Sequence, residues 1–386
     1  MAGARSEGEP AGGRIVAIRL LHFRVPFRQP YVTAAGSADV REGVIVRIET
    51  EGGAEGLGES SLLPERSAET AAFLTEVEEA CAWALGRSLT SVSHQGVPDL
   101  WRRAGSGVEI AAWDALARSR GQSLTAFGSL GPPVEAVAVN ALVTAAEPEA
   151  VRAACAAAAA AGYRAVKLKC GLAGAAGREA LRIAAARQGL GEGVKLRIDA
   201  NGAWSERQAT SVLRAAARYD LEYAEQPVAA GDLAAMRRLR ARTGTPIAAD
   251  EDVTSREDVD RVIAEEAADV VVLKPLQLGG IGHTLRAAAA AREAGLSVTV
   301  TSSIDSAVGV AAALHVAAIL HSRGYMPGRV HAAGLDTLGL LEATLSRTRL
   351  EVRRGMMALP DGPGLGIDLD RRALARYVVA ERALAE

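Results

Sequence analysis

Apolar and polar positions in the N-terminal third of the chain follow first a strand pattern and then a helix pattern. The runs IVAIRLLHF and GVIVRIET, within residues 14–50, alternate as half-buried strands do, and GAEGLGES follows at 53–60 after a short turn. Apolar residues then recur with a helical period at 68–85 and 107–120. The pattern predicts an antiparallel meander of three strands followed by two helices.

A cluster of prolines and glycines divides the chain. The segment GSLGPPVEA at 128–136 contains two of each residue and interrupts any regular element. We therefore expect an α+β unit over residues 14–131 and a second unit that begins at residue 132. Residues 1–13, MAGARSEGEPAGG, carry no apolar periodicity and are expected to form a flexible lead-in.

Beyond this boundary, short apolar runs alternate with long alanine-rich helical stretches. Repeated strand-then-helix units predict parallel strands, and eight of them predict a closed TIM-type (β/α) barrel over residues 132–345. A doubly wound open sheet is the alternative, but no GxGxxG motif opens a helix after the first run. The eight runs lie at 136–142, 165–169, 194–199, 221–225, 246–250, 269–274, 296–302 and 329–333.

Composition narrows the class of protein. The 386 residues include 44 basic and 46 acidic side chains, and no basic stripe is interleaved with aromatics, which argues against a nucleic acid partner. Cys81, Cys155 and Cys170 form no CxxC pair and are expected to be reduced thiols. The alanine-rich run at 153–161 is too short to cross a bilayer. We expect a cytoplasmic protein that does not bind membranes.

A charged residue closes five consecutive runs. These residues are Lys169, Asp199, Glu225, Asp250 and Lys274, and successive members stand 24 to 30 residues apart. Taken alone, each has an ordinary explanation, such as a turn at Asp199 or a solvated helix start at Asp250. Because the carboxyl ends of parallel barrel strands meet at one mouth, where barrel enzymes keep their active sites, we expect the five side chains to gather there.

Three converging carboxylates imply a cation. Asp199, Glu225 and Asp250 would repel one another in a partly dry mouth and would be driven toward protonation unless a positive ion lay between them. An all-oxygen donor set without histidine or cysteine favours a hard ion, Mg²⁺, with Mn²⁺ as a second choice. We therefore predict a magnesium site.

Two lysines share one face of the run AVKLK at 165–169. Side chains alternate along a strand, so Lys167 and Lys169 point to the same side. A second ammonium nearby disfavours protonation, and we expect Lys167 to lower the pKa of Lys169 toward that of a general base. Lys274 would face it from across the barrel. Such an array suits removal of a proton next to a carboxylate, with the metal stabilising the enediolate.

Five motifs in order carry a family resemblance. KLK at 167–169, DANG at 199–202, EQP at 225–227, DED at 250–252 and VVLKPLQLGG at 271–280 resemble the muconate-lactonizing branch of the enolase superfamily. GLGES and the tail motif GPGLGID resemble parts of its capping domain, which implies that residues 346–386 pack back on the N-terminal unit. The roles implied are metal ligands at Asp199, Glu225 and Asp250, an acid/base pair at Lys169 and Lys274, and supporting residues at Asn201 and Glu251.

Within that branch, two longer segments resemble o-succinylbenzoate synthases of menaquinone biosynthesis: PFRQPYVTAAGSADVREGVIVRI and TSSIDSAVGVAAALHVAAIL. The resemblance implies a syn-dehydration in which Lys169 takes the α-proton and returns it to the departing hydroxyl, while Lys274 acts as a cation. N-acylamino acid racemases and other epimerases or cycloisomerases of the branch use the same two lysines, so these activities remain alternatives. A Schiff-base aldolase and a non-catalytic barrel are alternatives of other classes.

Substrate contacts are expected from the cap and from further strand ends. The cap segment 33–41 and the residues Asn140, Ser302 and Ile304 are the candidates. His331, in the last run, is expected to be structural, and Asp252, where the family motif frequently has serine, adds a negative charge. The partner is expected to be a small carboxylate, and a homo-oligomer is compatible with the sequence.

Overall fold

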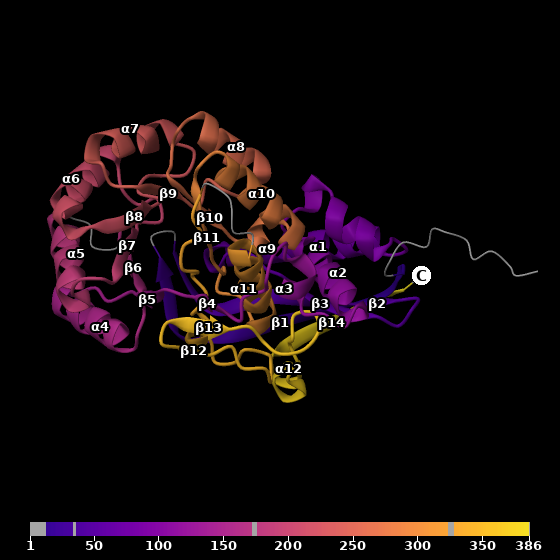
Figure 1. The fold of residues 1–386 in the computed structure, drawn as a ribbon. Helices are drawn as coiled ribbons and strands as arrows, with labels where there is room; N and C mark the ends of the chain where they lie inside the picture. The colour runs from indigo at the N-terminus through magenta and orange to yellow at the C-terminus, as the bar shows by residue number, and fades with distance from the viewer. Residues whose placement is uncertain (1–12, 34–35, 172–175, 323–327, 386) are drawn as a thin grey trace, which may run out of the picture.

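The computed structural model describes residues 13–33, 36–171, 176–322 and 328–385 (Figure 1). Twelve of the thirteen residues of the expected lead-in, 1–12, lie outside the described residues. Within the described ranges, no helix is long and apolar enough to cross a membrane.

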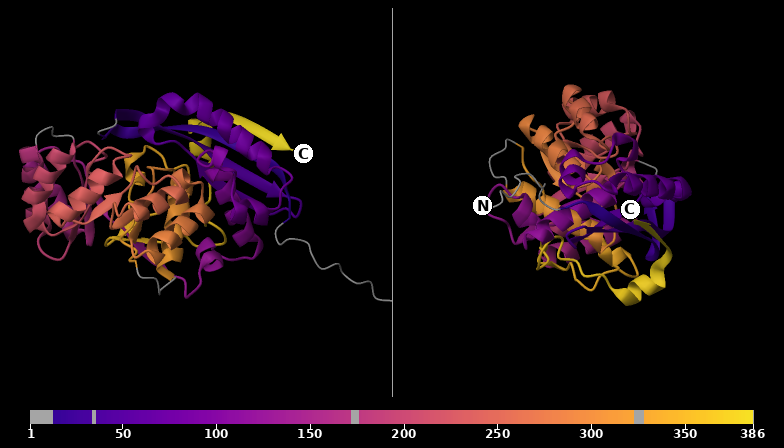
Figure 2. Two further views of the ribbon diagram at one scale, coloured as in Figure 1. Left: turned by 90° about the horizontal axis from the view of Figure 1, so that it is seen from above. Right: turned by 90° about the vertical axis from the view of Figure 1, so that its right-hand side faces the viewer.

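An antiparallel sheet forms the N-terminal unit, with the strand order β14-β1-β2-β3. The predicted meander of the first three strands is confirmed. The chain's last strand completes the sheet, since β14 pairs antiparallel with β1 from Ala17↔Ala385 onward, and Figure 2 shows it along the outer edge. The strands are β1 (Ile15–Thr33), β2 (Gly36–Thr50), β3 (Glu55–Ser60) and β14 (Val378–Ala385).

Two helices cover this sheet, close to where the sequence predicts them: α1 (Thr70–Ala84) and α2 (Ser106–Ser119). Helix α2 packs tightly on β3, and the glycines of the GLGES motif allow this approach. A Cβ atom at Gly58 would lie only 1.9 Å from the carbonyl oxygen of Gly107 in α2. Any larger residue at Gly58 would push the helix away from the sheet.

Seven parallel strands form a curled sheet in the order β11-β10-β9-β8-β7-β6-β5. The strand-then-helix prediction is confirmed for these units, and Figure 1 shows α4 to α8 as an arc outside the strands. The strands are β5 (Ala141–Val143), β6 (Ala165–Lys169), β7 (Lys195–Asp199), β8 (Leu221–Glu225), β9 (Ile247–Ala249), β10 (Val270–Leu273) and β11 (Ser297–Val300). The helices between and after them are α4 (Pro148–Ala160), α5 (Ala176–Leu190), α6 (Glu206–Ala216), α7 (Leu233–Thr243), α8 (Arg256–Ala264), α10 (Ile281–Glu293) and α11 (Ala307–Ser322).

The first and last predicted barrel strands differ from expectation. The run 136–142 is split, because β4 (Ala136–Ala138) pairs with β13 (Met356–Ala358), and β5 begins only at Ala141. The run 329–333 is extended without forming a named strand. It makes isolated parallel bridges to β11 at Val298↔Val330 and to the other edge at Val139↔Ala333.

Short elements complete the chain. The helical turns are η1 (Pro64–Glu69), η2 (Ser91–Gln95), η3 (Asp99–Trp101), η4 (Ala217–Tyr219) and η5 (Leu338–Leu340). The remaining helices are α3 (Leu124–Gly128), α9 (Pro275–Leu278) and α12 (Arg371–Tyr377), and β12 (Val352–Arg353) pairs with β13.

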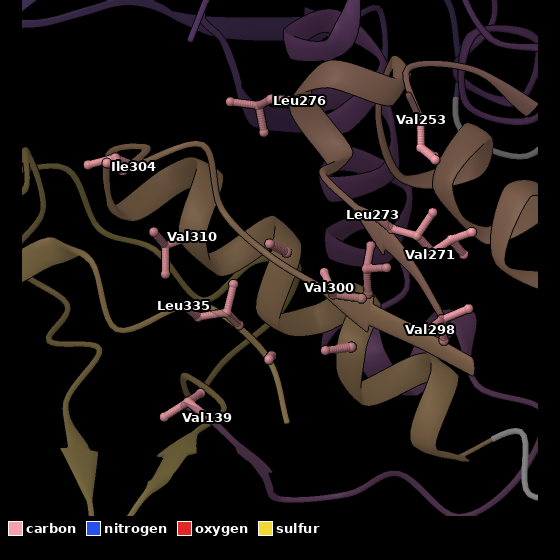
Figure 3. Packing of buried hydrophobic residues seen from close by; sticks show 14 of the residues in the cluster. Val139, Val253, Val271, Leu273, Leu276, Val298, Val300, Ile304, Val310 and Leu335 are labelled. Carbon is pink, nitrogen blue, oxygen red and sulfur yellow. The ribbon is translucent and has the colours of Figure 1, made fainter. Parts of the chain in front are cut away.

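The main hydrophobic cluster includes the parallel sheet, the helices packed on it and part of the cap. Val271 of β10 and Val298 and Val300 of β11 belong to the same buried cluster as Val310 of α11 (Figure 3). Residues 307–320 of α11 are all buried, because this helix contacts β11 on one side and β3 of the cap on the other. Full burial of each valine contributes about 1.5–3 kcal/mol. Because α11 also contacts β3, this helix connects the cap to the parallel sheet.

Candidate active site

The strand ends bring the five predicted charged residues to one edge of the parallel sheet. Lys169 pairs in register with Asp199, and Asp199 pairs in register with Glu225. Asp250 directly follows β9 and Lys274 directly follows β10. Four of the five, all except Glu225, line a pocket of about 700 Å³ that includes space open to solvent.

The DANG sequence explains how Asp199 is held at the end of β7. Asn201 and Gly202 have φ angles of 44° and 72°, a left-handed conformation that these two residue types tolerate. The backbone amide nitrogen of Asn201 donates a hydrogen bond of 3.1 Å to Asp199 Oδ1. The turn therefore leaves Asp199 Oδ2 free to face the strand beside it.

The two lysines of β6 lie on the same side of the strand, as predicted, and both contact Asp199. Lys167 Nζ lies 2.8 Å from Glu225 Oε1 and 3.1 Å from Asp199 Oδ2, so it bridges two carboxylates. Lys169 Nζ donates to Asp199 Oδ2 and to Asn201 Oδ1, each at 2.7 Å. Both ammonium groups thus serve as counter-ions to the acidic strand ends.

Lys274 approaches from the other side. Its Nζ donates a hydrogen bond of 2.7 Å to Asp250 Oδ2. Asn201 Nδ2 donates to Glu251 Oε1 at 2.9 Å, so the two expected supporting residues contact one another. A continuous polar chain therefore runs from Lys169 through Asn201 to Glu251, beside the Asp250–Lys274 pair.

The expected lowering of the pKa of Lys169 is wrong for this arrangement. Burial and the neighbouring Lys167 do lower it, but the Asp199 carboxylate outweighs them, and the net result is a raised pKa. The same balance holds at Lys274. Burial lowers its pKa, but the Asp250 carboxylate has the larger opposite effect, and the net result is a raised pKa. Both lysines are therefore ammonium ions while they stay paired with these carboxylates.

The carboxylates differ in whether neighbouring ammonium groups outweigh the effect of burial on their pKa. Burial disfavours the ionised form of Asp199, but Lys169 and Lys167 outweigh it and hold its pKa well below the usual range. Burial, followed by repulsion from Asp199, raises the pKa of Glu225 to about 8. Burial and the adjacent Asp250 raise the pKa of Glu251 to about 7. Glu225 and Glu251 are therefore less readily ionised than Asp199 in this arrangement.

Glu225 has an oxygen atom that is available to bind a cation. Its Oε2 atom is buried and has no hydrogen-bond partner within the described part of the chain. In the same residues, no group of three or more histidine, cysteine, aspartate or glutamate side chains is arranged to hold a metal ion. Lysine ammonium groups contact the oxygens of Asp199, Glu225 and Asp250 instead. The donor chemistry fits a hard cation, which would compete with the lysines for these carboxylates.

The three expected substrate-contact residues all line the same pocket. Asn140 is 4% exposed, and its Oδ1 accepts a hydrogen bond of 3.0 Å from Arg197 Nη1. Ser302 Oγ lies 2.9 Å from Thr337 Oγ1. In the cap segment 33–41, Thr33 lines the pocket as well, while residues 34 and 35 lie outside the described residues.

Sequence reasoning missed one acidic residue of the pocket. Asp336 lines it, and its Oδ2 accepts a hydrogen bond of 2.5 Å from the hydroxyl of Tyr163. Asp336 stands three residues beyond the run 329–333, and a wider search for polar residues after each run would have found it. From the cap, Tyr31 and the loop 63–65 also reach the pocket.

His331 and Asp252 have structural partners. The His331 ring lies 3.2 Å from Glu222 Oε1 and packs edge-on against Tyr223. Asp252 accepts hydrogen bonds of 2.7 Å from Gln226 Nε2 and 2.6 Å from the Gly231 amide nitrogen. Neither residue is among the described side chains that line the pocket.

Comparison with known families identifies the class of protein. Residues 15–127 match the N-terminal domain of the mandelate racemase / muconate lactonizing enzyme family, and residues 149–373 match the family described as enolase C-terminal domain-like. The second match covers more than half of the chain. The chain therefore belongs to the enolase superfamily, in its muconate-lactonizing branch, as its motifs predict.

Individual relatives are enzymes of more than one type. The chain is 39% identical to an o-succinylbenzoate synthase of Thermobifida fusca (strain YX) over 193 residues, which are 50% of this chain and 56% of that protein. This chain thus spans about half the length of the first curated relatives that it matches. An N-succinyl-L-Arg/Lys racemase of Bacillus cereus is 27% identical across 95% of this chain and 98% of its own length.

A solved structure shows the same fold along nearly the whole chain. A dipeptide epimerase from Cytophaga hutchinsonii, crystallised with Mg and the dipeptide D-Ala-L-Val, superimposes with a TM-score of 0.84 at 26% identity. The superposition covers 96% of this chain and 99% of the epimerase. This chain is therefore similar in sequence to a lyase, and similar in sequence and fold to isomerases.

Proposed function

We propose that this protein removes a proton α to a carboxylate of a small substrate, with the help of a divalent cation. The placement of Lys169 and Lys274 carries the proposal. Their strands, β6 and β10, are separated in the sheet by β7, β8 and β9, which supply the three acidic strand ends. A substrate whose carboxylate lies over the acidic residues presents its α-carbon between two amines.

Magnesium is the cation that we infer, with manganese as the second choice. Asp199, Glu225 and Asp250 would hold it, because oxygen donors alone favour a hard ion and because Glu225 Oε2 is buried without a partner. When bound, the ion supplies positive charge that offsets the charge developing on the substrate carboxylate as the proton leaves.

The protein's own groups position and move the proton. Lys169 can accept a proton at Nζ only as a neutral amine, so it must first release its own proton to solvent and give up its ion pair with Asp199. Asn201 Oδ1, 2.7 Å from Nζ, keeps the amine oriented when that pairing is lost. Cap residues such as Tyr31 cover the pocket and limit the access of water, which strengthens the electrostatic interactions inside it.

Within this reaction class we favour dehydration to o-succinylbenzoate, the activity named for the Thermobifida relative. Lys169 takes the α-proton and returns it to the hydroxyl group that departs from the same face of the ring, so that water is released and the ring becomes aromatic. Lys274 remains an ammonium ion throughout. This assignment would place the protein in menaquinone biosynthesis.

Racemisation of N-acylamino acids is the second candidate, because the Bacillus cereus racemase matches this chain along almost its full length. In this reaction one lysine removes the α-proton and the other donates a proton to the opposite face. The two candidates differ in whether Lys274 cycles between ammonium and amine.

We infer further that the parallel sheet closes into a TIM barrel. The segment 329–334 supports this inference. The backbone amide nitrogen of His331 donates to the carbonyl oxygen of Val298 in β11, and that of Ala333 donates to the carbonyl oxygen of Ala138, three residues before the other edge strand, β5, each at 2.8 Å. Closure would place the acidic strand ends and Asp336 around a single mouth.

The proposal is tested by assaying the purified protein with and without Mg²⁺ on two substrates. The cyclohexadiene carboxylate precursor should aromatise to o-succinylbenzoate, and N-succinylamino acids in deuterated water should acquire deuterium at the α-carbon if the second activity is present. Borohydride trapping of a substrate on a lysine would instead indicate a Schiff-base enzyme. If neither substrate is converted in the presence of Mg²⁺, the proposal is contradicted.

A further inference from the structure

A buried ion pair joins the cap to the barrel next to the pocket. Arg41 of β2 and Asp305, in the loop before α11, are each 1% exposed, and Arg41 Nη2 lies 2.9 Å from Asp305 Oδ1. Arg41 also donates hydrogen bonds to the Leu62 carbonyl oxygen and to Ser61 Oγ. One guanidinium group therefore holds two segments that are far apart in sequence.

Each segment continues directly into a wall of the pocket. On the cap side, Leu62 is followed by the pocket-lining residues 63–65. On the barrel side, Asp305 follows the pocket-lining residues 302–304, and its Oδ2 accepts a hydrogen bond of 3.0 Å from the Ser303 amide nitrogen. The Asp305 side chain thus reaches back across Ile304.

The barrel loop is held in a conformation that its sequence does not favour. Ile304 has a φ of 61°, in the left-handed region that a β-branched residue rarely adopts. Such a conformation persists only where the surroundings enforce it. Asp305 does so from one side, and Gln277 adds a second link, since its Nε2 donates to the Ser61 carbonyl oxygen at 3.1 Å and to Ser303 Oγ at 3.3 Å.

We propose that Arg41 and Asp305 are positioning residues: their ion pair fixes the cap segment 63–65, at the start of η1, against the loop 302–304 and thereby sets the shape of the substrate pocket. Neither side chain lines the pocket, so neither contacts substrate directly. The pair acts on binding through the two loops. The kinetic part of this inference rests on the proposed function, whereas its structural part does not.

The main test replaces both partners, in the double variant Arg41→Met/Asp305→Leu. Removing one charge alone would leave the other buried and unpaired, whereas removing both leaves an apolar pair of similar size that folded proteins often tolerate. The matched control is Arg47→Met/Glu55→Gln, which removes an exposed ion pair of 3.4 Å within the same cap sheet. Amide hydrogen exchange and steady-state kinetics are then measured on the whole chain.

In the double variant, exchange should accelerate at least about tenfold in 61–65 and 302–306 and stay unchanged in β10, since only the loops lose their link. KM should rise about tenfold or more while kcat changes less than about threefold, which is the pattern of lost binding rather than lost chemistry. The control variant should match the wild type in both measurements.

Unchanged exchange in the two loops, or equal acceleration in β10, would overturn the proposal, because the pair would then be inert or merely stabilising. If the double variant does not fold, Asp305→Asn carries the same test, with an expected change of about threefold in the same two segments. The exchange result is obtained even if neither assayed substrate is turned over, so a failure of the proposed function is distinguishable from a failure of this inference.

Discussion

Lys169 and Asp199 face each other in parallel register at the ends of β6 and β7, with 2.7 Å between Nζ and Oδ2. The lysine that we propose as the base is therefore the counter-ion of a carboxylate that we propose as a metal ligand. A cation at Asp199 and the ammonium group of Lys169 compete for the same oxygen. Metal binding and deprotonation of the lysine are consequently linked.

Replacement of Lys169 should separate chemistry from metal binding. Lys169→Ala should lower the rate of α-proton exchange by about 10²–10⁴-fold, the usual contribution of a general base. Affinity for Mg²⁺ should not fall, since a competing cation is removed. Exchange of the α-proton followed by NMR in deuterated water, with a parallel calorimetric titration of Mg²⁺, measures both quantities.

The control is Lys195→Ala, because Lys195 begins β7 at the far end from Asp199 and its side chain is 54% exposed. This variant should behave as the wild type does. Exchange at the normal rate in Lys169→Ala would remove that residue from the mechanism.

Replacement of Asp250 should chiefly weaken the binding of Mg²⁺. Asp250→Asn removes one anionic donor and should weaken Mg²⁺ binding by about 10–100-fold, measured by calorimetry or by the Mg²⁺ concentration that gives half-maximal activity. Asp260→Asn, at an exposed residue of α8 paired with Arg256, is the matched control. Equal Mg²⁺ affinity in the two variants would show that Asp250 does not bind the ion.

Asp336 should weaken the binding of both candidate substrates, because each carries a second carboxylate in its succinyl group. β8, which carries Glu225, is the central strand of the seven, and the segment before Asp336 makes bridges near both outer edges. If the sheet closes as we infer, Asp336 lies on the side of the barrel opposite Glu225. Asp336→Asn should lower the KM for N-succinylamino acids about 3–10-fold at low ionic strength, with a smaller effect at high salt. A higher KM in this variant would mean that Asp336 binds the substrate through a donor or cationic group instead.

His315 should make stability fall at acid pH. Its ring is buried, Nδ1 lies 2.7 Å from Thr125 Oγ1, and burial lowers its pKa from 6.5 to about 4. The unfolded chain therefore binds a proton between these values that the folded chain does not, so stability is present above pH 6.5 and is lost as pH falls toward 4.

The size of this effect is at most about 3 kcal/mol. Denaturant unfolding of wild type and His315→Gln at a series of pH values measures it. The variant should lose less stability between pH 6.5 and 4 than the wild type, and identical slopes would exclude His315 as the source.

Most of the parallel sheet could be predicted from the sequence, because each buried strand is a short apolar run bounded by polar residues. The two outermost runs were harder to predict. At Ala136–Ala138 the local pattern favours a strand but does not indicate which strand it pairs with. In the structure it pairs with β13, more than 200 residues away in sequence. The pairing of β14 with β1 depends likewise on tertiary contact. The residue boundaries proposed for the domains remain predictions.

The clustering of the charged strand ends could also be predicted, because strand spacing alone brings Lys169, Asp199 and Glu225 together. The ionisation states of these residues could not be predicted from the sequence. Which carboxylate each lysine selects depends on distances of a few ångströms, and that selection reverses the expected direction of the pKa shift at Lys169. Asp336 was missed because it lies three residues beyond its run rather than at the end of it.

A crystal structure of the protein with bound Mn²⁺, located by anomalous scattering, is the most direct test of the central claim. We predict one ion bound by carboxylate oxygens of Asp199, Glu225 and Asp250, at about 2.0–2.2 Å from each, with Lys169 Nζ no longer within hydrogen-bonding distance of Asp199. An ion bound elsewhere, or no ion at these oxygens while Lys167 and Lys169 keep their present contacts, would contradict the account.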